Sequence, residues 1–371
     1  MTESPKIKVG IIGCGIATFH TSAYATDPRV QMVAIAGLDT DRCRALATKH
    51  DIPEVYTNYE DLLANADVDL VSVAVPNFLH APVALAAIAV GKHVLMEKPL
   101  ARNSAEGEQI VCAARDASVI VAMAFNRRAR PDMQVLKKHI DEGGLGDIYY
   151  AKAFWMRRAG IPGLGSWFTS KELAGGGPLI DLGVHVLDMA LWLMDNPKVV
   201  AVSAATYAEL GPQGKGQWGG SRFTVTDNQP YEVEDLATAL LRMENGATLQ
   251  LETSWAGYTG HTDEFGVSLL GNNGGAELHV RDYASTGTLR LFNDVGGAPT
   301  DAAPRLQTKE VWEGHAQIVH SLIDGILHGT PVSPSIEEGL DRSRLIDAIY
   351  QSAALGRELR IDELTVDLPA S

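Results

Sequence analysis

The sequence predicts an α/β fold in which a doubly wound parallel sheet is followed by a second domain with a large, mostly antiparallel sheet. Three observations predict this fold class. Over residues 6–123, short apolar runs alternate with helical patterns, which is typical of βαβ units. The runs are continuously apolar, as in VDLVSVAV, so they suit strands that helices cover on both faces. After residue 126 the runs are longer, alternate with period two and are joined by hairpin turns.

The first domain is expected to hold five strands that alternate with helices. The strands are predicted at Lys8–Ile12, Val30–Ala36, Leu70–Val75, His93–Met96 and Val119–Ala124. The helices are predicted from the turn at Gly13–Gly15 through Ala25, and at Asp41–His50, Pro82–Val90 and Ser104–Asp116. Each strand then ends in a short loop, which is where ligands of open α/β sheets bind.

The second domain begins with a helix at Pro131–Glu142 and continues mainly as strands. The alternation predicts strands at Ile148–Arg157, Val199–Ala208, Leu236–Met243, Ala247–Trp255, Phe265–Leu270 and Ala276–Val280, with edge strands at Leu289–Asn293 and Thr308–Val311. Helices near 178–194 and at Ala316–His328 are expected to cover one sheet face, and a last helix is predicted at Ile336–Leu355. Loops are predicted at Gly211–Gln229 and Gly296–Pro304. We place the two domains at residues 1–127 and 128–371.

Composition argues against several classes of protein. The 371 residues carry 31 Lys and Arg against 46 Asp and Glu, a formal net charge of −15. A chain this acidic lacks the basic surface of a nucleic-acid-binding protein and the basic face of a membrane-surface helix. It has no run of about 20 apolar residues, so no membrane span is expected. The three cysteines, Cys14, Cys43 and Cys112, form no CxxC pair, so we expect buried or half-buried free thiols and a cytoplasmic location.

A glycine motif follows the first predicted strand and opens the first helix, which is the context of a dinucleotide-binding site. Gly13 permits the tight turn, and Gly15 allows the chain to approach a pyrophosphate. Ile16 and Ala17 then begin the helix, whose free N–H groups and positive dipole end attract phosphate. The third glycine of the motif is absent, and Ala17 or Thr18 stands near its place.

The end of the second strand bears on the choice between NAD and NADP. Asp39 stands about 20 residues after the glycines, where an acidic side chain binds the ribose hydroxyls of NAD. Directly after the strand, however, Gly37 has no carboxylate to repel a 2′-phosphate, and Arg42 can pair with one. Arg42 and Asp41 are equally well explained as solvated charges at a helix start. The sequence therefore predicts NAD or NADP as the cofactor without choosing between them.

Three further strand ends bring polar groups to the same edge of the sheet. Glu97 and Lys98 follow the fourth strand, and a desolvated lysine there can touch a substrate hydroxyl or the cofactor ribose. Asn126 follows the fifth strand. The segment after the third strand is expected to line the cofactor through Val75, Pro76, Asn77 and His80, and a residue that only starts the next helix is the alternative for His80.

A narrow polar stripe crosses the otherwise apolar helix predicted near 178–194. Asp181, His185 and Asp188 are spaced i, i+4 and i+7, so they share one face. An imidazole beside a carboxylate suits proton transfer near neutral pH, which makes His185 a candidate acid–base and Asp181 its partner. A structural Asp–His pair is the alternative. A cation site is a weaker one, because no second His or Cys cluster supports it, and we assign no metal.

Two candidate substrate-binding residues lie in or beside the Gly-rich loop 160–177. Trp167 either contacts a ligand or anchors this loop as it closes over one. Arg158 can hold a substrate hydroxyl, and an exposed arginine at the end of a sheet is the alternative.

Together these segments resemble the glucose–fructose oxidoreductase, inositol dehydrogenase and rhizopine-catabolism (Gfo/Idh/MocA) family over nearly the whole chain. The resemblance rests on GIIGCGIATFH, PNFLHAPVALAAIAVGKHVLMEKPLA, FNRR, EGGLGDI and GGGPLIDLGVHVLDMALWLM. The combination of EKP with D-x-x-x-H at this distance is specific to that family. Two departures bear on cofactor preference. The glycine loop is one residue shorter than usual before His20, and Gly37 replaces the acidic residue typical of NAD users.

The resemblance implies an N-terminal Rossmann domain and a C-terminal α+β domain whose open sheet face forms a homodimer or homotetramer. It implies an NAD(P)-dependent oxidoreductase that moves a hydride between nicotinamide and a secondary alcohol or carbonyl of a sugar, polyol or glycoside. The family's catalytic residues map onto Lys98, Asp181 and His185, with His185 as general acid–base. Similar proteins touch the cofactor at the positions of Asn126 and Trp167. The substrate is expected to contact Lys98, Arg158, Trp167, Asp181 and His185.

Two other functions remain open. The same site can serve a lyase or glycosidase, in which tightly bound NAD oxidises the substrate transiently and no net redox change results. The second is a non-catalytic sensor that binds a dinucleotide. Loss of Lys98 or His185 would favour a sensor, but both residues are present.

Overall fold

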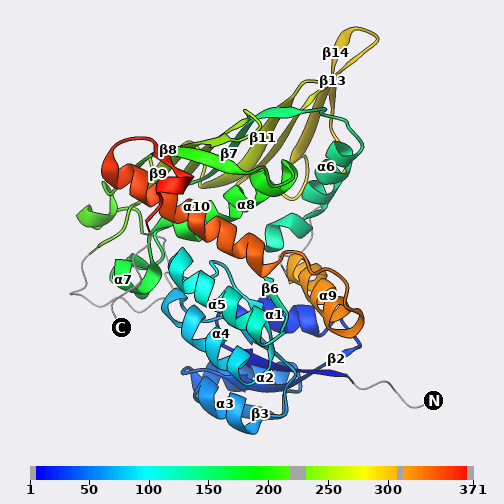
Figure 1. Cartoon of the computed structure of the whole chain (residues 1–371), viewed down its shortest axis with the longest axis vertical. Helices are drawn as coiled ribbons and strands as arrows, with labels where there is room; N and C mark the ends of the chain where they lie inside the picture. The colour runs from blue at the N-terminus through cyan, green and yellow to red at the C-terminus, as the bar shows by residue number, and fades with distance from the viewer. Residues whose placement is uncertain (1–5, 218–230, 307–311, 366–371) are drawn as a thin grey trace. The chain divides into compact units, whose positions relative to one another are not determined.

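The computed structural model describes residues 6–217, 231–306 and 312–365, which divide into two compact units (Figure 1). Within these ranges the first unit comprises residues 6–129 and 312–343, and the second comprises 130–306 and 344–365. The chain therefore leaves the first unit near Ala129 and returns to it for a later segment. The sequence pattern gave no sign of this return.

The first unit contains a six-stranded sheet in the order β3-β2-β1-β4-β5-β6, and every neighbouring pair is parallel. This order confirms the doubly wound parallel sheet. A short strand at Glu54–Tyr56 and a helix at Tyr59–Asn65 lie between the second and third predicted strands, and the sequence did not predict either of them. The strands are β1 (Ile7–Ile12), β2 (Val30–Ala36), β3 (Glu54–Tyr56), β4 (Leu70–Val73), β5 (His93–Met96) and β6 (Val121–Met123).

One helix of the first unit, α9 (Trp312–His328), was expected in the second domain. Helix α9 packs against α1 (Ala17–Tyr24), and its buried Val319 and Leu322 share an apolar core with Val9 of β1. The expectation that Ala316–His328 covers the antiparallel sheet is therefore wrong. Helix α1 is short and rich in small residues, and α9 fills the remaining apolar space beside it. The other helices are α2 (Thr40–Lys49), α3 (Tyr59–Asn65), α4 (His80–Ala89) and α5 (Ser104–Asp116).

The second unit contains a nine-stranded sheet in the order β14-β13-β12-β11-β7-β10-β9-β8-β15. Only the β10–β7 pair is parallel among the pairs described, so the mostly antiparallel sheet is confirmed. The strands are β7 (Ile148–Arg157), β8 (Val199–Tyr207), β9 (Leu236–Met243), β10 (Thr248–Ser254), β11 (Asp263–Gly271), β12 (Gly275–Arg281), β13 (Leu289–Val295), β14 (Ala298–Ala302) and β15 (Leu359–Arg360).

The edges of this sheet differ from the expectation. The predicted loop Gly296–Pro304 contains β14, which forms a hairpin with β13 across Gly296 and Gly297, both at positive φ. The predicted edge strand Thr308–Val311 and most of the predicted loop Gly211–Gln229 lie outside the described residues. The short β15 after the last helix was not predicted.

Helix α8 (Val184–Leu193) covers one face of the nine-stranded sheet, where it contacts β7, β10 and β11. The covered face of β7 presents Ala151, Ala153 and Trp155, which are buried, whereas the alternate residues are half-buried. The other helices of this unit are α6 (Pro131–Asp141), α7 (Lys171–Ala174) and α10 (Ile336–Leu355), and the division between the units falls within α10.

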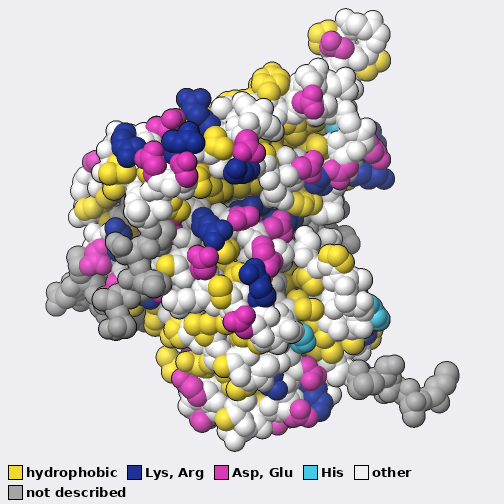
Figure 2. All heavy atoms as spheres, viewed as in Figure 1, with side chains coloured by type: hydrophobic (Ala, Val, Ile, Leu, Met, Phe, Trp, Pro, Cys, Tyr) yellow, Lys and Arg dark blue, Asp and Glu magenta, His cyan; other side chains and the backbone are white. Residues whose placement is uncertain are grey.

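One helical stretch of the described chain, Lys171–Leu193, has the length and apolar character that crossing a membrane requires. However, 89% of its most apolar window is buried inside the structure, as expected for the core helix of a folded domain. On the face of the molecule in Figure 2, Lys and Arg side chains lie among Asp and Glu side chains.

Candidate functional site

The loops after β1 and β4 meet at the point where the strand order of the first sheet reverses, which is where open α/β sheets bind ligands. Gly13 has φ +107°, and a Cβ there would overlap the carbonyl oxygen of Ala74 after β4. Only glycine fits this turn, for reasons of both backbone conformation and space. The structure thus brings the glycine motif against the loop that carries Val75, Pro76 and Asn77.

The turn leaves room for a ligand beside the start of α1. A Cβ on Gly15 would meet no atom within 4 Å, and Gly15 and Ile16 are exposed while Ala17 is buried. Ile16 precedes the helix without a side-chain cap, and the first turn holds no acidic residue. Such a helix end is suited to phosphate. At the end of β6, the buried Oδ1 of Asn126 has no partner among the described residues. These features fit a dinucleotide.

The loop after β2 shows why position 37 carries no acidic side chain. A Cβ on Gly37 would lie 2.8 Å from the Cys43 sulfur and 3.4 Å from the Cys14 sulfur, so the space is already filled. Asp39 is the cap of α2, and its Oδ1 accepts the backbone N–H of Arg42 at 3.1 Å. Asp39 and Arg42 are both exposed. The two cysteine sulfurs hydrogen-bond to each other, and this bond lowers the pKa of Cys14 to about 7.

His80 joins the loops after β4 and β5. It is buried, with Nδ1 at 2.6 Å from the carbonyl oxygen of Pro99 and Nε2 at 3.0 Å from that of Val75. Carbonyl oxygens only accept, so a neutral ring donates to one of them and a protonated ring to both. Burial lowers the pKa of His80 and favours the neutral ring. The ring therefore holds the two loops together.

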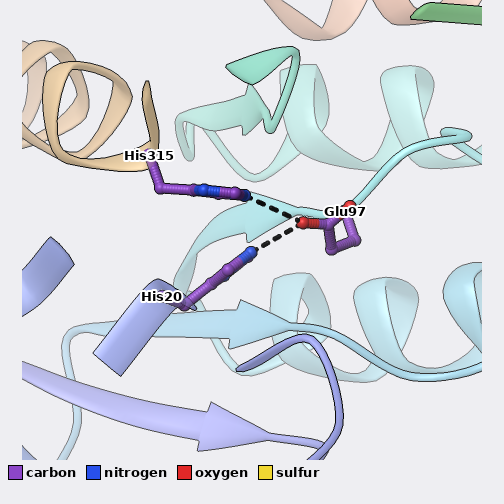
Figure 3. A group of neighbouring side chains, drawn as sticks. All are labelled: His20, Glu97 and His315. Carbon is purple, nitrogen blue, oxygen red and sulfur yellow. Dashed lines mark hydrogen bonds and ion pairs between the residues drawn. The ribbon is translucent and has the colours of Figure 1, made fainter. Parts of the chain in front are cut away.

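Glu97 lies at the centre of a buried polar cluster that includes His20 and His315 (Figure 3). Its Oε1 is 2.8 Å from Nε2 of His20 and 3.4 Å from Nε2 of His315, and its Oε2 accepts the Lys98 backbone N–H at 3.0 Å. Burial by itself raises the pKa of Glu97, but the bonds from His20 and His315 outweigh it and hold the pKa well below 4.5. The carboxylate is therefore ionised, and Lys98 beside it is half-buried.

In the second unit, three consecutive glycines prepare the start of the polar-stripe helix. Gly175 ends α7 in the left-handed conformation, and Cβ atoms on Gly176 and Gly177 would overlap Tyr350 and Glu234. Glu234 is buried and accepts the backbone N–H groups of Gly177 and Leu179 at 3.0 Å and the Tyr350 hydroxyl at 2.8 Å. The carboxylate thus caps the helix that follows. Burial raises its pKa despite these bonds.

The polar stripe begins on a π-helical turn, not on the continuous α-helix that was predicted. The turn spans Leu179–Gly183 and runs directly into α8. Asp181 on the turn is half-buried, while His185 and Asp188 on α8 are 8% and 1% exposed. A π turn has more residues per turn than an α-helix, so Asp181 is rotated from the position that strict i, i+4 spacing gives it. Short π turns occur frequently at functional sites.

Each residue of this candidate pair has a tryptophan neighbour from the sheet. The Trp255 indole donates to Asp181 Oδ2 at 2.9 Å, and the Trp155 ring lies 5.7 Å from the His185 ring. Trp167 stacks on Phe168 at 3.8 Å, and Phe168 meets Trp255 edge to face at 6.3 Å. Trp167 therefore belongs to the same aromatic group as Trp255, which holds Asp181.

The two arginines at the end of β7 have different surroundings. Arg158 is exposed, and its guanidinium donates to the carbonyl oxygen of Thr259 at 2.6 Å. Arg157 donates to Asp263 at 2.7 Å, and Asp263 also accepts the Trp155 indole N–H at 2.9 Å. Asp263 therefore fixes the tryptophan that lies beside His185.

Sequence reasoning missed the residues that hold the candidates in place. These lie far along the chain from the residues they contact, so spacing gave no sign of them. The sequence did hold a signal for the tryptophans and for the glutamate. A buried tryptophan or carboxylate needs a polar partner, so such a residue in or beside a predicted strand indicates a contact with another polar group. The missed residues are His315, Trp155, Trp255, Glu234 and Tyr350.

Comparison with known proteins gives consistent matches along the chain. Residues 7–125 match the model of the oxidoreductase family with an NAD-binding Rossmann fold, and residues 133–277 match the GFO/IDH/MocA C-terminal domain. The chain is 33% identical to the D-glucoside 3-dehydrogenase of Escherichia coli (strain K12), covering 97% of this chain and 99% of that protein. It is 27% identical to the scyllo-inositol 2-dehydrogenase (NADP(+)) of Bacillus subtilis (strain 168), with 96% of each covered. A solved levoglucosan dehydrogenase in complex with NADH and levoglucosan superposes with a TM-score of 0.85 at 25% identity, covering 96% of this chain and 99% of that one.

Proposed function

We propose, because this chain belongs to the Gfo/Idh/MocA oxidoreductase family, that it is an NAD(P)-dependent dehydrogenase acting on a ring secondary hydroxyl of a glucose-like glycoside. The observation that carries the proposal is the loop after β1, where Gly13, the open space at Gly15 and the uncapped start of α1 suit a dinucleotide. The full-length similarity to a D-glucoside 3-dehydrogenase supports the substrate class and makes position 3 of the ring the first to test.

The cofactor is assigned to the residues at the carboxyl ends of the parallel strands. When bound, the nicotinamide ring supplies the acceptor for the hydride that leaves the carbinol carbon. Gly13, Gly15, Ile16 and Ala17 take the pyrophosphate, and Asp39 and Arg42 are the groups that meet the adenosine ribose or its 2′-phosphate. The remaining cofactor residues are Val75, Pro76, Asn77, His80, Glu97, Lys98, Asn126 and Trp167, with His80 acting through the two loops that it joins.

Proton transfer is assigned to His185. As the carbinol carbon loses its hydride, the hydroxyl proton passes to the His185 imidazole and the product is a ketone, so charge and atoms balance. Asp181 orients the substrate and the imidazole, and its own position is fixed by Trp255. The Lys98 ammonium donates to the substrate oxygen, which stabilises negative charge as the proton leaves. Arg158 and Trp167 are proposed to contact the sugar.

A substrate panel tests the function. Purified protein is assayed with NAD⁺ and with NADP⁺ against methyl D-glucosides, levoglucosan and inositols, following nicotinamide reduction. The expected result is turnover of a glucoside, a primary isotope effect with deuterium at position 3 of the ring, and no turnover of the 3-deoxy analogue. If cofactor binds but is never reduced and the glycosidic bond is cleaved instead, the dehydrogenase assignment is wrong and a lyase or glycosidase is indicated.

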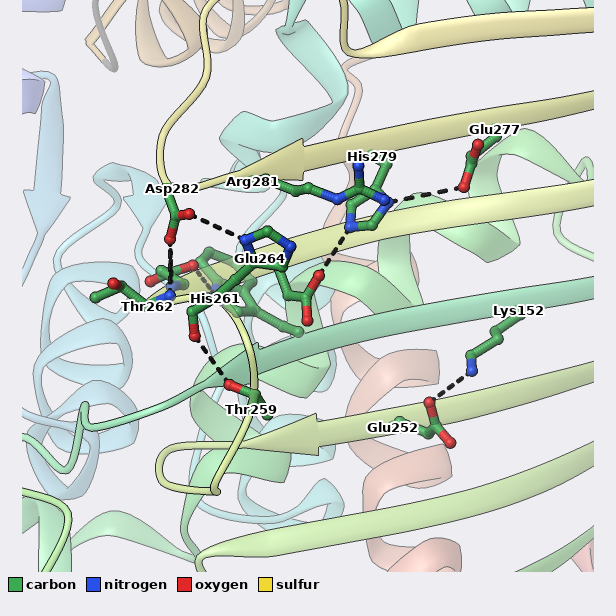
Figure 4. Close-up of polar contacts among 12 residues, drawn as sticks. Lys152, Glu252, Thr259, His261, Thr262, Glu264, Glu277, His279, Arg281 and Asp282 are labelled. Carbon is green, nitrogen blue, oxygen red and sulfur yellow. Dashed lines mark hydrogen bonds and ion pairs between the residues drawn. The ribbon is translucent and has the colours of Figure 1, made fainter.

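The uncovered face of the nine-stranded sheet is proposed to form a homodimer or homotetramer. Polar side chains there are paired within the face (Figure 4): Lys152 with Glu252 at 2.8 Å, and His279 with Glu264 at 3.0 Å. Phe154 lies between these pairs, with its ring 5.0 Å from that of His279. A second copy of the chain that covers this face would therefore bury few unpaired charges. Light scattering on wild type and Phe154→Glu tests this: the variant is expected to be a monomer, and an unchanged mass places the interface elsewhere.

The cytoplasm is the proposed location. Cys14, Cys43 and Cys112 are all free thiols, which suits a reducing compartment. Cell fractionation with an antibody against the chain tests the assignment, and recovery outside the cytoplasmic fraction would contradict it.

A further inference from the structure

The buried cluster of His20, Glu97 and His315 has no assigned role in the reaction proposed above. His20 lies on α1 and Glu97 directly follows β5, whereas His315 lies on α9, in the segment by which the chain returns to the first unit. All three side chains are buried, at 0%, 5% and 2% exposed. Burial of this many ionisable groups is costly unless each is bonded.

The bonding of Glu97 divides between its two oxygens. Oε1 faces His20 and His315 (Figure 3). Oε2 accepts the backbone N–H of Lys98. An ionised carboxylate only accepts, so both imidazoles must donate through Nε2. On its other side, Nδ1 of His20 lies 2.6 Å from the Ser72 hydroxyl oxygen. The position of Lys98 is thus tied to two imidazoles through one carboxylate.

His315 is itself held firmly at the start of α9. Its ring is parallel to that of Phe19, with centroids 5.9 Å apart, and 5.0 Å from that of His20. One residue earlier, Gly314 packs so closely on the Asn126 carbonyl that a Cβ there would lie 2.5 Å from the oxygen. The start of α9 therefore contacts the loops after both β5 and β6, where the cofactor residues Glu97 and Asn126 lie.

We infer that His315 is a positioning residue, which acts through Glu97 to hold the backbone of Lys98. The inference rests on the proposed function, since it takes Lys98 as a catalytic residue. Without the second imidazole, the buried carboxylate keeps a single side-chain donor and can turn or take up a proton, and either change releases the Lys98 N–H.

A metal centre is the competing interpretation, because the ligand atoms of the three residues lie within 4.8 Å of one another. The spacing favours hydrogen bonding. His20 Nε2 and Glu97 Oε1 are 2.8 Å apart, whereas two ligands of one zinc ion at about 2.0–2.1 Å each must stand more than 3 Å apart in a tetrahedral site.

The test is a double-mutant cycle between His315 and Lys98, in the holoenzyme with saturating cofactor. His315→Phe keeps the ring that stacks on Phe19 and removes the donor. It is expected to lower kcat about tenfold in the wild-type background and less than about twofold in Lys98→Ala, because coupled residues are not additive. His315→Gln, which retains an N–H donor, is expected to restore most of the activity. Val319→Ala, a buried change on the same helix, is expected to leave kcat unchanged.

A second readout does not depend on activity. Hydrogen exchange at the Lys98 amide, followed by mass spectrometry of the peptide 94–101, is expected to be faster in His315→Phe and unchanged in His315→Gln and Val319→Ala. Equal loss of kcat in both backgrounds, or unchanged exchange in His315→Phe, overturns the inference. So does one equivalent of zinc or iron in the wild type that His315→Phe loses. If Lys98→Ala alone leaves turnover unchanged, the failure lies in the catalytic assignment of Lys98.

Discussion

The indole nitrogen of Trp255 donates a hydrogen bond of 2.9 Å to Oδ2 of Asp181. Trp255 is fully buried just after β10, whereas Asp181 is half-buried on the π-helical turn. The bond ties a polar side chain of the candidate site to the rigid sheet. It also links Asp181 to the aromatic group that contains Phe168 and Trp167.

Trp255→Phe is expected to lower kcat about tenfold, since a charged acceptor loses a buried donor and Asp181 gains freedom to move. Steady-state kinetics with the preferred glycoside measures the effect. Trp192→Phe, on the half-buried side of α8, is the matched control and should behave as wild type. Equal kcat values for the two variants would show that the Trp255 bond does not matter for turnover.

His185→Asn is expected to lower kcat by about 10²–10⁴-fold, the usual contribution of a positioned general base. Binding of reduced cofactor, followed by fluorescence titration, should change little, because all the residues proposed to bind the cofactor except Trp167 lie on the first unit. A folded variant with wild-type turnover would contradict the assigned role of His185.

Gly13 and Gly15 are expected to respond differently to a side chain. Gly13→Ala places a Cβ against the Ala74 carbonyl at φ +107°, so we expect a loss of about 1–3 kcal/mol in the free energy of unfolding. Gly15→Val points into open space, so the fold should tolerate it while the dissociation constant for NADH rises at least about tenfold. Denaturant unfolding and cofactor titration of both variants make the comparison. Wild-type cofactor affinity in Gly15→Val would exclude this loop as the pyrophosphate site.

Cys14 is expected to be the most reactive thiol of the chain at neutral pH. Its hydrogen bond with Cys43 lowers its pKa to about 7, so the thiolate fraction rises as the pH increases through 7. The rate of iodoacetamide alkylation, measured by mass spectrometry in Cys112→Ser protein, should follow that curve. Cys43→Ser should shift it, and bound NADH should slow the reaction, because Cys14 lies between Gly13 and Gly15. A rate independent of NADH would contradict the placement of the cofactor.

Glu97 is expected to make the fold sensitive to acid. Its pKa in the folded state is well below 4.5, so at acidic pH the unfolded chain binds more protons than the folded chain. The free energy of unfolding therefore rises with pH over the acidic range. The stabilisation that Glu97 contributes is present above pH 4.5 and is lost as the pH falls below it. Urea titrations between about pH 3 and 7 should show a smaller acid slope for Glu97→Gln than for wild type or for the exposed control Glu60→Gln. An unchanged slope would show that Glu97 is not the group that titrates.

The sequence predicted the elements whose neighbours are close in the chain. The strands that precede Gly13, Lys98 and Asn126 have continuous apolar runs, and the rule that ligands bind at strand ends then indicated the residues that we propose for the cofactor. Helix α10 and most strands of the second sheet were also predicted, because the spacing of their apolar residues can be read from each segment alone.

What the sequence did not predict depends on contacts between distant segments. The apolar face of α9 is equally suited to either sheet, and only the space beside α1 decides where it packs. The π turn at Asp181 cannot be read from a periodicity of 3.6, because it arises where Glu234 and the glycines set the start of the helix. His315 shows no motif at all, and its position becomes evident only from the fold.

The return of α9 also sets the order in which a newly made chain can fold. The first unit is not complete until residues 312–343 have been made, after the long segment that begins at residue 130. At a synthesis rate of about 5–20 residues per second, α9 is made about 10–40 s after the first segment of this unit is finished. During that interval the apolar surface that α9 later covers, around Val9, Tyr24 and Ile35, must be shielded by the unfinished chain itself or by a chaperone.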